Sequence, residues 1–158
     1  MNLNADFTDL LDALDDAGVK YMIVGAHAMA AHGVPRATAD IDIFVLAEVE
    51  NAKRVYRALV QFGAPVVLHG ITARDFEVAG DVYQMGLPPR RIDLLTAIDG
   101  VSFRDAWIGH QRMAYEGRSV PVIGLRELVR NKLASGRPKD RADIDLLQAV
   151  GVDVEALR

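Results

Sequence analysis

Short apolar runs alternate along the chain with segments whose apolar residues recur at helical spacing. The helical spacing predicts seven helices, and the apolar runs predict six strands between them. Strands and helices alternating around one sheet indicate an α/β or α+β protein. The predicted helices cover residues 4–17, 26–32, 48–62, 72–78, 103–109, 125–135 and 139–150, and the strands cover 19–24, 38–45, 82–85, 91–95, 113–115 and 119–122.

Two acidic residues, Asp40 and Asp42, interrupt the apolar strand predicted at 38–45. Side chains alternate faces along a strand, so both carboxylates point to one face, and Ile41 and Ile43 point to the other. Aspartate is depleted in strands, and like charges repel unless a cation lies between them. Mg²⁺ takes oxygen ligands and commonly bridges carboxylates to substrate phosphates. The pattern therefore predicts a divalent-metal site.

Two further features belong with this pair. Gly25 stands where the strand 19–24 turns into a helix, and Ala26 follows it. Backbone N–H groups at a helix start bind anions, and glycine lets a phosphate approach the backbone closely. Asp93 is a lone carboxylate in the apolar strand 91–95. If the strands that carry Asp42 and Asp93 are neighbours, we expect all three carboxylates on one face.

Composition narrows the class of protein. The 158 residues are enough for one domain, with an expected core at about 19–122 and a C-terminal helical part at about 124–150. The chain has no cysteine, which excludes thiolate chemistry and disulfides. The net charge of −4 gives no general attraction to nucleic acid. The chain has no signal-peptide pattern or membrane-spanning run, and we expect a cytoplasmic protein with no membrane partner.

Three motifs then resemble a known family: Ile23-Val24-Gly25-Ala26, Asp40-Ile41-Asp42-Ile43 and Ile92-Asp93-Leu94, in this order. They are similar to the signature of the polymerase-β-like nucleotidyltransferase superfamily. Residues 28–42, with Lys132 and 139–143, resemble small bacterial proteins of the AbiEii and related toxin–antitoxin type. The likeness spans about residues 20–147. It implies a mixed sheet flanked by helices, with helices at the C-terminus, and transfer of a nucleoside monophosphate from an NTP to an acceptor hydroxyl.

The resemblance also implies roles for individual residues. Asp40 and Asp42 would hold Mg²⁺, or Mn²⁺, on the triphosphate. Asp93 would complete a second metal site and help to deprotonate the acceptor. The family's glycine is usually followed by Gly or Ser, so Ala26 removes a hydroxyl and is expected to change nucleotide affinity. The expected nucleotide contacts are Gly25, Ala26, Arg36 and Lys132, with Thr38 bracing the metal strand.

The sequence leaves several alternatives open. Asp93 has a purely structural interpretation as an ion pair with Arg91, two residues away. A basic cluster near the C-terminus is either a solvated helical face or a platform for triphosphate or RNA. His27 fits packing better than nucleotide contact. The cluster comprises Arg126, Arg130, Lys132, Arg137, Lys139 and Arg141.

The function also has alternatives. The leading hypothesis is an enzyme of a toxin–antitoxin or phage-defence system, with a tRNA 3′ end or a protein hydroxyl as acceptor and a cognate toxin or antitoxin as partner. One alternative is an antitoxin-type protein adenylyltransferase or an antibiotic nucleotidyltransferase. Another is a catalytically inactive nucleotide-binding module.

Overall fold

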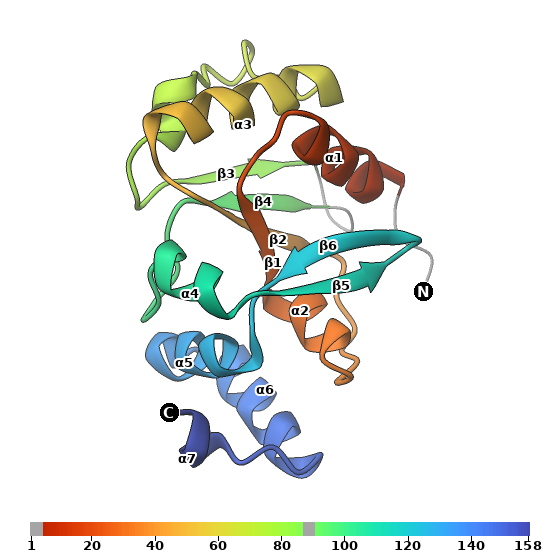
Figure 1. Cartoon of the computed structure of the whole chain (residues 1–158), viewed down its shortest axis with the longest axis vertical. Coiled ribbons are helices and arrows are strands. Elements are labelled where there is room, and N and C mark those ends of the chain that lie inside the picture. The colour runs from red at the N-terminus through yellow and green to blue at the C-terminus, as the bar shows by residue number, and fades with distance from the viewer. Residues whose placement is uncertain (1–4, 87–90) are drawn as a thin grey trace.

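The protein folds around one six-stranded sheet, seen in the computed structural model, which describes residues 5–86 and 91–158 (Figure 1). The strands are β1 (Tyr21–Val24), β2 (Ile41–Val45), β3 (Val82–Met85), β4 (Ile92–Leu95), β5 (Gln111–Tyr115) and β6 (Arg118–Val122). Their order across the sheet is β3-β4-β2-β1-β6-β5. The pairs β2–β4 and β1–β6 are parallel, and the other neighbouring pairs are antiparallel. The expected mixed sheet is therefore confirmed.

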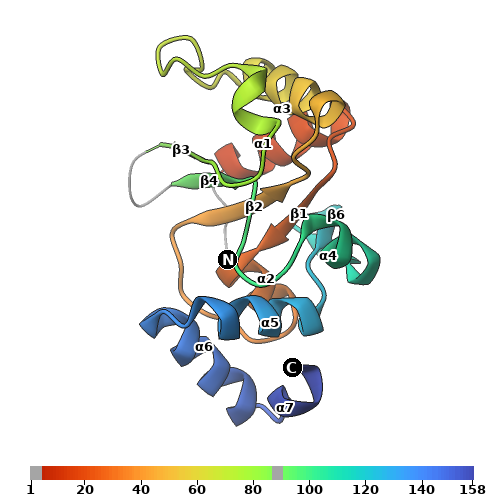
Figure 2. The same cartoon turned by 90° about the vertical axis from the view of Figure 1, so that its left-hand side faces the viewer.

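Helices cover both sides of this sheet (Figure 2). They are α1 (Ala5–Asp16), α2 (Gly25–Ala31), α3 (Val49–Phe62), α4 (Phe103–Gly109), α5 (Leu125–Ser135), α6 (Pro138–Ala149) and α7 (Val154–Leu157), with a 3₁₀ helix η1 (Ala73–Phe76). Helices α1 and α3 pack together on one side, whereas α2 and the C-terminal helices α5, α6 and α7 lie on the other. The C-terminal helices pack mainly on one another.

The two central strands are apolar because helices lie over both of their faces. All four residues of β1 are buried, and in β2 every residue is buried except Asp42, which is partly exposed. A nearly continuous apolar run is typical of strands covered on both faces. Asp42 is thus the one charged residue in the two central strands, and the candidate active site described below is centred on it.

The predicted strands and most predicted helices are present, with shifts of one to three residues at several ends, such as β1 beginning at Tyr21 and β5 at Gln111. Strand β2 begins at Ile41, three residues later than expected, so Asp40 precedes the strand. The Thr38 hydroxyl accepts a hydrogen bond from the N–H of Asp40 and donates one to its C=O, both at 3.2 Å. This local turn competes with the strand ladder for the same backbone groups. Within the predicted helix 72–78, only the 3₁₀ helix η1 forms, and helix α7 was not predicted. The predicted Asn4 cap and residues 87–89 of the predicted β3–β4 turn lie outside the described residues.

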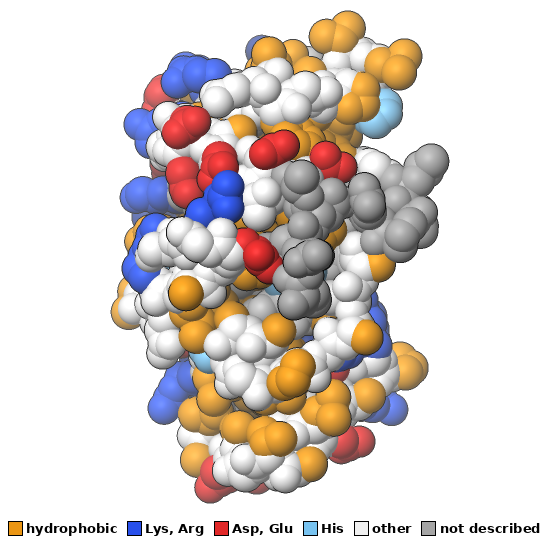
Figure 3. Space-filling model, turned by 90° about the vertical axis from the view of Figure 1, so that its right-hand side faces the viewer, with side chains coloured by type: hydrophobic (Ala, Val, Ile, Leu, Met, Phe, Trp, Pro, Cys, Tyr) orange, Lys and Arg blue, Asp and Glu red, His pale blue; other side chains and the backbone are white. Residues whose placement is uncertain are grey.

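Exposed apolar side chains lie on separate elements. Val67 and Leu68, in the loop after α3, are 85% and 84% exposed, and Ile108 at the end of α4 is 85% exposed. On the face in Figure 3, hydrophobic side chains appear near the top and around the C-terminal helices at the bottom. Within the described residues, no helix is both long and apolar enough to cross a membrane.

The β5–β6 hairpin generates a stability prediction. Its two turn residues, Glu116 and Gly117, have φ angles of 50° and 78°. Such turns favour Asn-Gly, and a glutamate in the left-handed region is strained. Glu116→Asn should raise the free energy of unfolding by about 0.5–1 kcal/mol, measured by urea denaturation. Glu116→Gln removes the same charge but keeps the strain, so it should leave stability unchanged. An equal gain in both variants would contradict this account.

Candidate active site

Two of the predicted carboxylates face each other on neighbouring strands. Strands β2 and β4 are parallel and in register, with Asp42 opposite Asp93. On its other side Asp42 lies opposite Val24, the last residue of β1, after which the chain turns through Gly25. The sheet therefore brings together residues that are far apart in the sequence. Asp40, two residues before Asp42, lies at the same edge.

The position of Asp42 makes its negative charge costly. Burial raises the pKa of Asp42 first, and the neighbouring carboxylate of Asp93 raises it further, to about 6. The positive charge of Lys139 opposes this shift but does not cancel it. Two carboxylates held this close are stabilised by a proton or by a cation between them.

Position 25 requires glycine for two reasons: its backbone φ angle and the lack of space for a Cβ atom. Its φ of +69° is one that glycine adopts without strain. A Cβ atom at this position would lie 2.4 Å from Oδ2 of Asp42. Asp42 thus packs directly on the Gly25 backbone, and any other residue there would displace the carboxylate.

Arg91 connects the carboxylates of Asp40 and Asp93. Its Nη2 lies 3.1 Å from Oδ2 of Asp40, and its Nε lies 3.1 Å from Oδ1 of Asp93. The ion pair between Arg91 and Asp93 that the sequence suggested is therefore present. It coexists with the carboxylate cluster, because Asp93 also faces Asp42.

The carboxylates of Asp40, Asp42 and Asp93 are chemically suited to a hard divalent cation, although their oxygens do not converge on one point as metal ligands. Three carboxylates at one sheet edge are the oxygen donors that Mg²⁺ and Mn²⁺ prefer. Among the described residues, no group of three or more His, Cys, Asp or Glu side chains has a geometry ready to hold a metal. The guanidinium of Arg91 pairs with both Asp40 and Asp93 in this arrangement. The role of the three carboxylates as metal ligands stays a prediction.

A pocket of about 380 Å³ opens beside these groups. It lies between the sheet edge and the C-terminal helices, since both contribute to its wall. The structure brings all eight residues of the predicted site to this one pocket; they are Gly25, Ala26, Arg36, Thr38, Asp40, Asp42, Asp93 and Lys132. His27 does not line it: its ring is buried against Phe7 and Tyr115.

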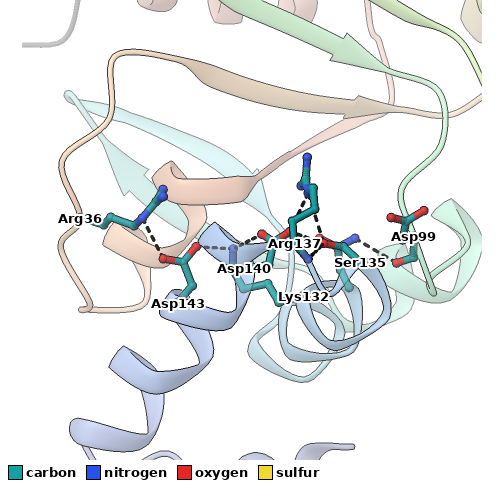
Figure 4. Close-up of polar contacts among 8 residues, drawn as sticks. Arg36, Asp99, Lys132, Ser135, Arg137, Asp140 and Asp143 are labelled. Atoms are coloured by element: carbon teal, nitrogen blue, oxygen red, sulfur yellow. Dashed lines mark hydrogen bonds and ion pairs between the residues drawn. The ribbon is translucent and has the colours of Figure 1, made fainter.

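Lys132 and Arg36 line the pocket but are already paired (Figure 4). The Lys132 ammonium is 3% exposed and lies 2.7 Å from Asp143 and 3.4 Å from Asp140. Nε of Arg36 lies 2.8 Å from Oδ1 of Asp143, an ion pair without hydrogen-bond alignment. Arg137 pairs with Asp140 at 2.8 Å. This cluster ties α5 and α6 to the loop before β2, and the predicted phosphate contacts of Lys132 and Arg36 stay predictions.

The predicted set omitted three basic residues that line the pocket: Arg91, Arg137 and Lys139. Lys139 is exposed in the first turn of α6, and its charge acts on Asp42. It makes no ion pair with any residue in the described ranges 5–86 and 91–158. Lys139 belongs to the basic cluster that the sequence offered as a platform for triphosphate or RNA, and that cluster was the signal available. Arg91 was considered as a structural partner of Asp93 and as an extension of that cluster.

Comparison with known proteins establishes the fold. No protein family and no curated protein matches the sequence. The solved structure of TM1012 from Thermotoga maritima, a proposed nucleotidyltransferase, matches with a TM-score of 0.58 and 16% identity over 90% of each chain. The solution structure of the antibiotic-resistance factor ANT(2″)-Ia matches with a TM-score of 0.65 and 18% identity, over 98% of this chain and 88% of that one. The crystal structure of ANT(2″)-Ia in complex with adenylyl-2″-tobramycin matches with a TM-score of 0.60 and 17% identity, over 96% of this chain and 91% of that one. The chain therefore has the nucleotidyltransferase-like α/β fold that the motifs implied.

The contact between Gly25 and Asp42 can be tested with a matched pair of glycines. Gly25→Ala and Gly33→Ala both place alanine at a positive φ, which should cost about 1 kcal/mol of unfolding free energy. Only Gly25→Ala also collides with a carboxylate, because no atom lies within 4 Å of a Cβ at Gly33. Gly25→Ala should therefore lose about 2 kcal/mol more in urea denaturation. Equal losses would show that Asp42 does not pack as described.

The raised pKa of Asp42 predicts a gain in stability on its neutralisation. The pKa in the folded protein is about 6, above the ordinary 3.8, so the cost of ionisation is complete above about pH 6 and absent below about pH 4. Without divalent ions, Asp42→Asn should raise the unfolding free energy by about 2 kcal/mol at pH 8. The gain should disappear at about pH 4. Urea denaturation at both pH values measures it, and a pH-independent difference would contradict the assignment.

Proposed function

We propose that this protein is a nucleotidyltransferase that transfers a nucleoside monophosphate from an NTP to an acceptor hydroxyl with the help of Mg²⁺ or Mn²⁺. One observation carries the proposal. Asp42 and Asp93 face each other in register, Asp40 adjoins them, and the pocket that they line is also lined by Gly25 and by basic residues from the C-terminal helices. The same fold occurs in solved nucleotidyltransferases.

The reaction is an in-line displacement at the α-phosphorus of the NTP. The acceptor oxygen forms a bond to this phosphorus, the bond to the β-phosphate oxygen breaks, and pyrophosphate leaves. Asp40 and Asp42 would hold the divalent ions, which neutralise charge on the attacking and leaving oxygens. Asp93 would complete a second metal site and help to deprotonate the acceptor hydroxyl. Such transfers depend mainly on positioning and charge neutralisation, which a rigid sheet edge provides.

Basic residues on the opposite wall suit the triphosphate. Lys139 is exposed, lines the pocket and is close enough to Asp42 to influence its charge. We assign it to the leaving pyrophosphate, with Arg36 and Lys132 as additional phosphate contacts. The backbone of Gly25 and Ala26 completes this side of the pocket. Ala26 offers no hydroxyl, so backbone groups and cations would carry the binding of phosphate.

The acceptor divides the proposal into branches. The leading branch is a toxin–antitoxin or phage-defence enzyme of the AbiEii type. It would act in the cytoplasm, where NTP is abundant, on a tRNA 3′ end or on the hydroxyl of a partner toxin or antitoxin. A second branch is an antibiotic nucleotidyltransferase. It is favoured by one observation: two of the matching structures are of ANT(2″)-Ia, and one matches over 98% of this chain.

A substitution of Asp42 tests the proposal. The protein is incubated with Mg²⁺, each of the four labelled NTPs, and total tRNA, cell protein or tobramycin as acceptor. We expect labelled product from one acceptor class, and Asp42→Asn should reduce its rate roughly 100-fold or more because a metal ligand is lost. Asp145→Asn, an exposed aspartate of α6 outside the pocket, is the matched control and should transfer normally.

The outcomes of this assay separate the alternatives. Label on RNA, on protein or on tobramycin identifies the acceptor branch. Binding of an NTP without turnover on any acceptor favours the inactive nucleotide-binding module. Equal transfer by wild type and Asp42→Asn would overturn the proposed site altogether.

A further inference from the structure

The guanidinium of Arg91 bridges two of the carboxylates that the proposed function assigns to a divalent ion. It contacts Asp40 through Nη2 and Asp93 through Nε, each at 3.1 Å, and its Nη2 lies 3.4 Å from the second oxygen of Asp93. Arg91 thus pairs with two of the three carboxylates that the proposed function assigns to metal.

A cation at this position serves the protein in the absence of metal. Three carboxylates at one sheet edge repel one another, and Asp42 has no ion pair with any residue of the described part of the chain. Arginine is suited to this role because its planar fork binds two carboxylates at once and cannot lose its proton. These contacts engage one oxygen of Asp40 and both oxygens of Asp93, so a divalent ion would compete with the guanidinium for them.

The bridge is also able to open. The side chains of Arg91 and Asp40 are each 34% exposed, so water can solvate both groups when they separate. Arg91 immediately precedes β4, and its side chain lies on the pocket wall. Half-exposed ion pairs are weak, so a divalent ion with a higher charge can displace the guanidinium. In contrast to this bridge, Asp42 is held in place because its carboxylate packs against Gly25.

We propose that Arg91 is an internal competitor of the metal: its guanidinium bridges Asp40 and Asp93 in the metal-free protein and must leave them when a divalent ion binds. The proposal rests on the proposed function only in taking these carboxylates as the metal ligands. It assigns to Arg91 control of metal affinity. The site would then stay closed to divalent ions at low concentration and fill when metal arrives with the triphosphate.

Mn²⁺ alone tests the proposal, without any transfer reaction. Free Mn²⁺ is measured by electron paramagnetic resonance while metal is titrated into wild type and variants. Arg91→Gln should bind Mn²⁺ about tenfold more tightly than wild type, the size expected for loss of two ion pairs of a partly exposed arginine. Its melting temperature in EDTA should fall, and Mn²⁺ should raise it more than in wild type. Arg118→Gln is the control: it also removes an arginine, whose Nη2 lies 2.7 Å from Asp12, outside the pocket.

A second substitution separates the bridge from a simple effect of charge. Arg91→Lys keeps the positive charge but cannot bind two carboxylates side by side, so its Mn²⁺ affinity should lie between those of wild type and Arg91→Gln. The proposal is overturned if Arg91→Gln binds Mn²⁺ no more tightly than wild type, or if Arg91→Lys equals wild type.

Mn²⁺ binding and the transfer assay together distinguish failure of this proposal from failure of the proposed function. If neither wild type nor Arg91→Gln binds Mn²⁺, the carboxylates are not a metal site and both proposals fall. If Arg91→Gln tightens Mn²⁺ binding and no acceptor is ever labelled, the role of Arg91 stands and nucleotidyl transfer falls.

Discussion

Repulsion between Asp42 and Asp93 is the constraint around which the pocket is arranged. Parallel pairing of β2 and β4 places the two carboxylates opposite each other, and partial burial of Asp42 together with burial of Asp93 limits their screening by water. The surrounding features compensate for this charge. Arg91 bridges Asp93 to Asp40, and Lys139 acts on Asp42 from across the pocket. Folding stability is thereby reduced at a place where a bound cation would restore it, which is common at functional sites.

A second charged cluster joins the sheet to the C-terminal helices. Lys132 is buried between Asp140 and Asp143, and Arg36, from the loop before β2, reaches the same Asp143. Buried charges are tolerated only when they are paired, so the helices and the loop fix each other's positions. This pairing holds one wall of the pocket against the other. Lys132 therefore already has two carboxylate partners at the pocket wall, whereas the exposed Lys139 has no ion pair among the described residues.

Most secondary structure was predictable because it depends on local patterns. The predicted helices at 103–109 and 125–135 have the observed bounds, since apolar spacing and end residues determine them. The start of β2 was wrong because the Thr38 hydroxyl takes up the backbone groups of Asp40, a contact that apolar patterning does not reveal. Helix α7 is four residues long and too short to give a periodic signal.

For the site, the order of residues was enough to identify the candidate chemistry: acidic residues in apolar strands, and a glycine at a strand-to-helix turn. These are local exceptions to the pattern around them, so they are visible without a fold. The folded structure was needed to show that Asp42 faces Asp93, that Gly25 packs on Asp42, and that Arg91 bridges two carboxylates. Strand order and helix docking set these contacts. They depend on residues distant in sequence whose pairing follows from packing of the whole core, and no local pattern records it.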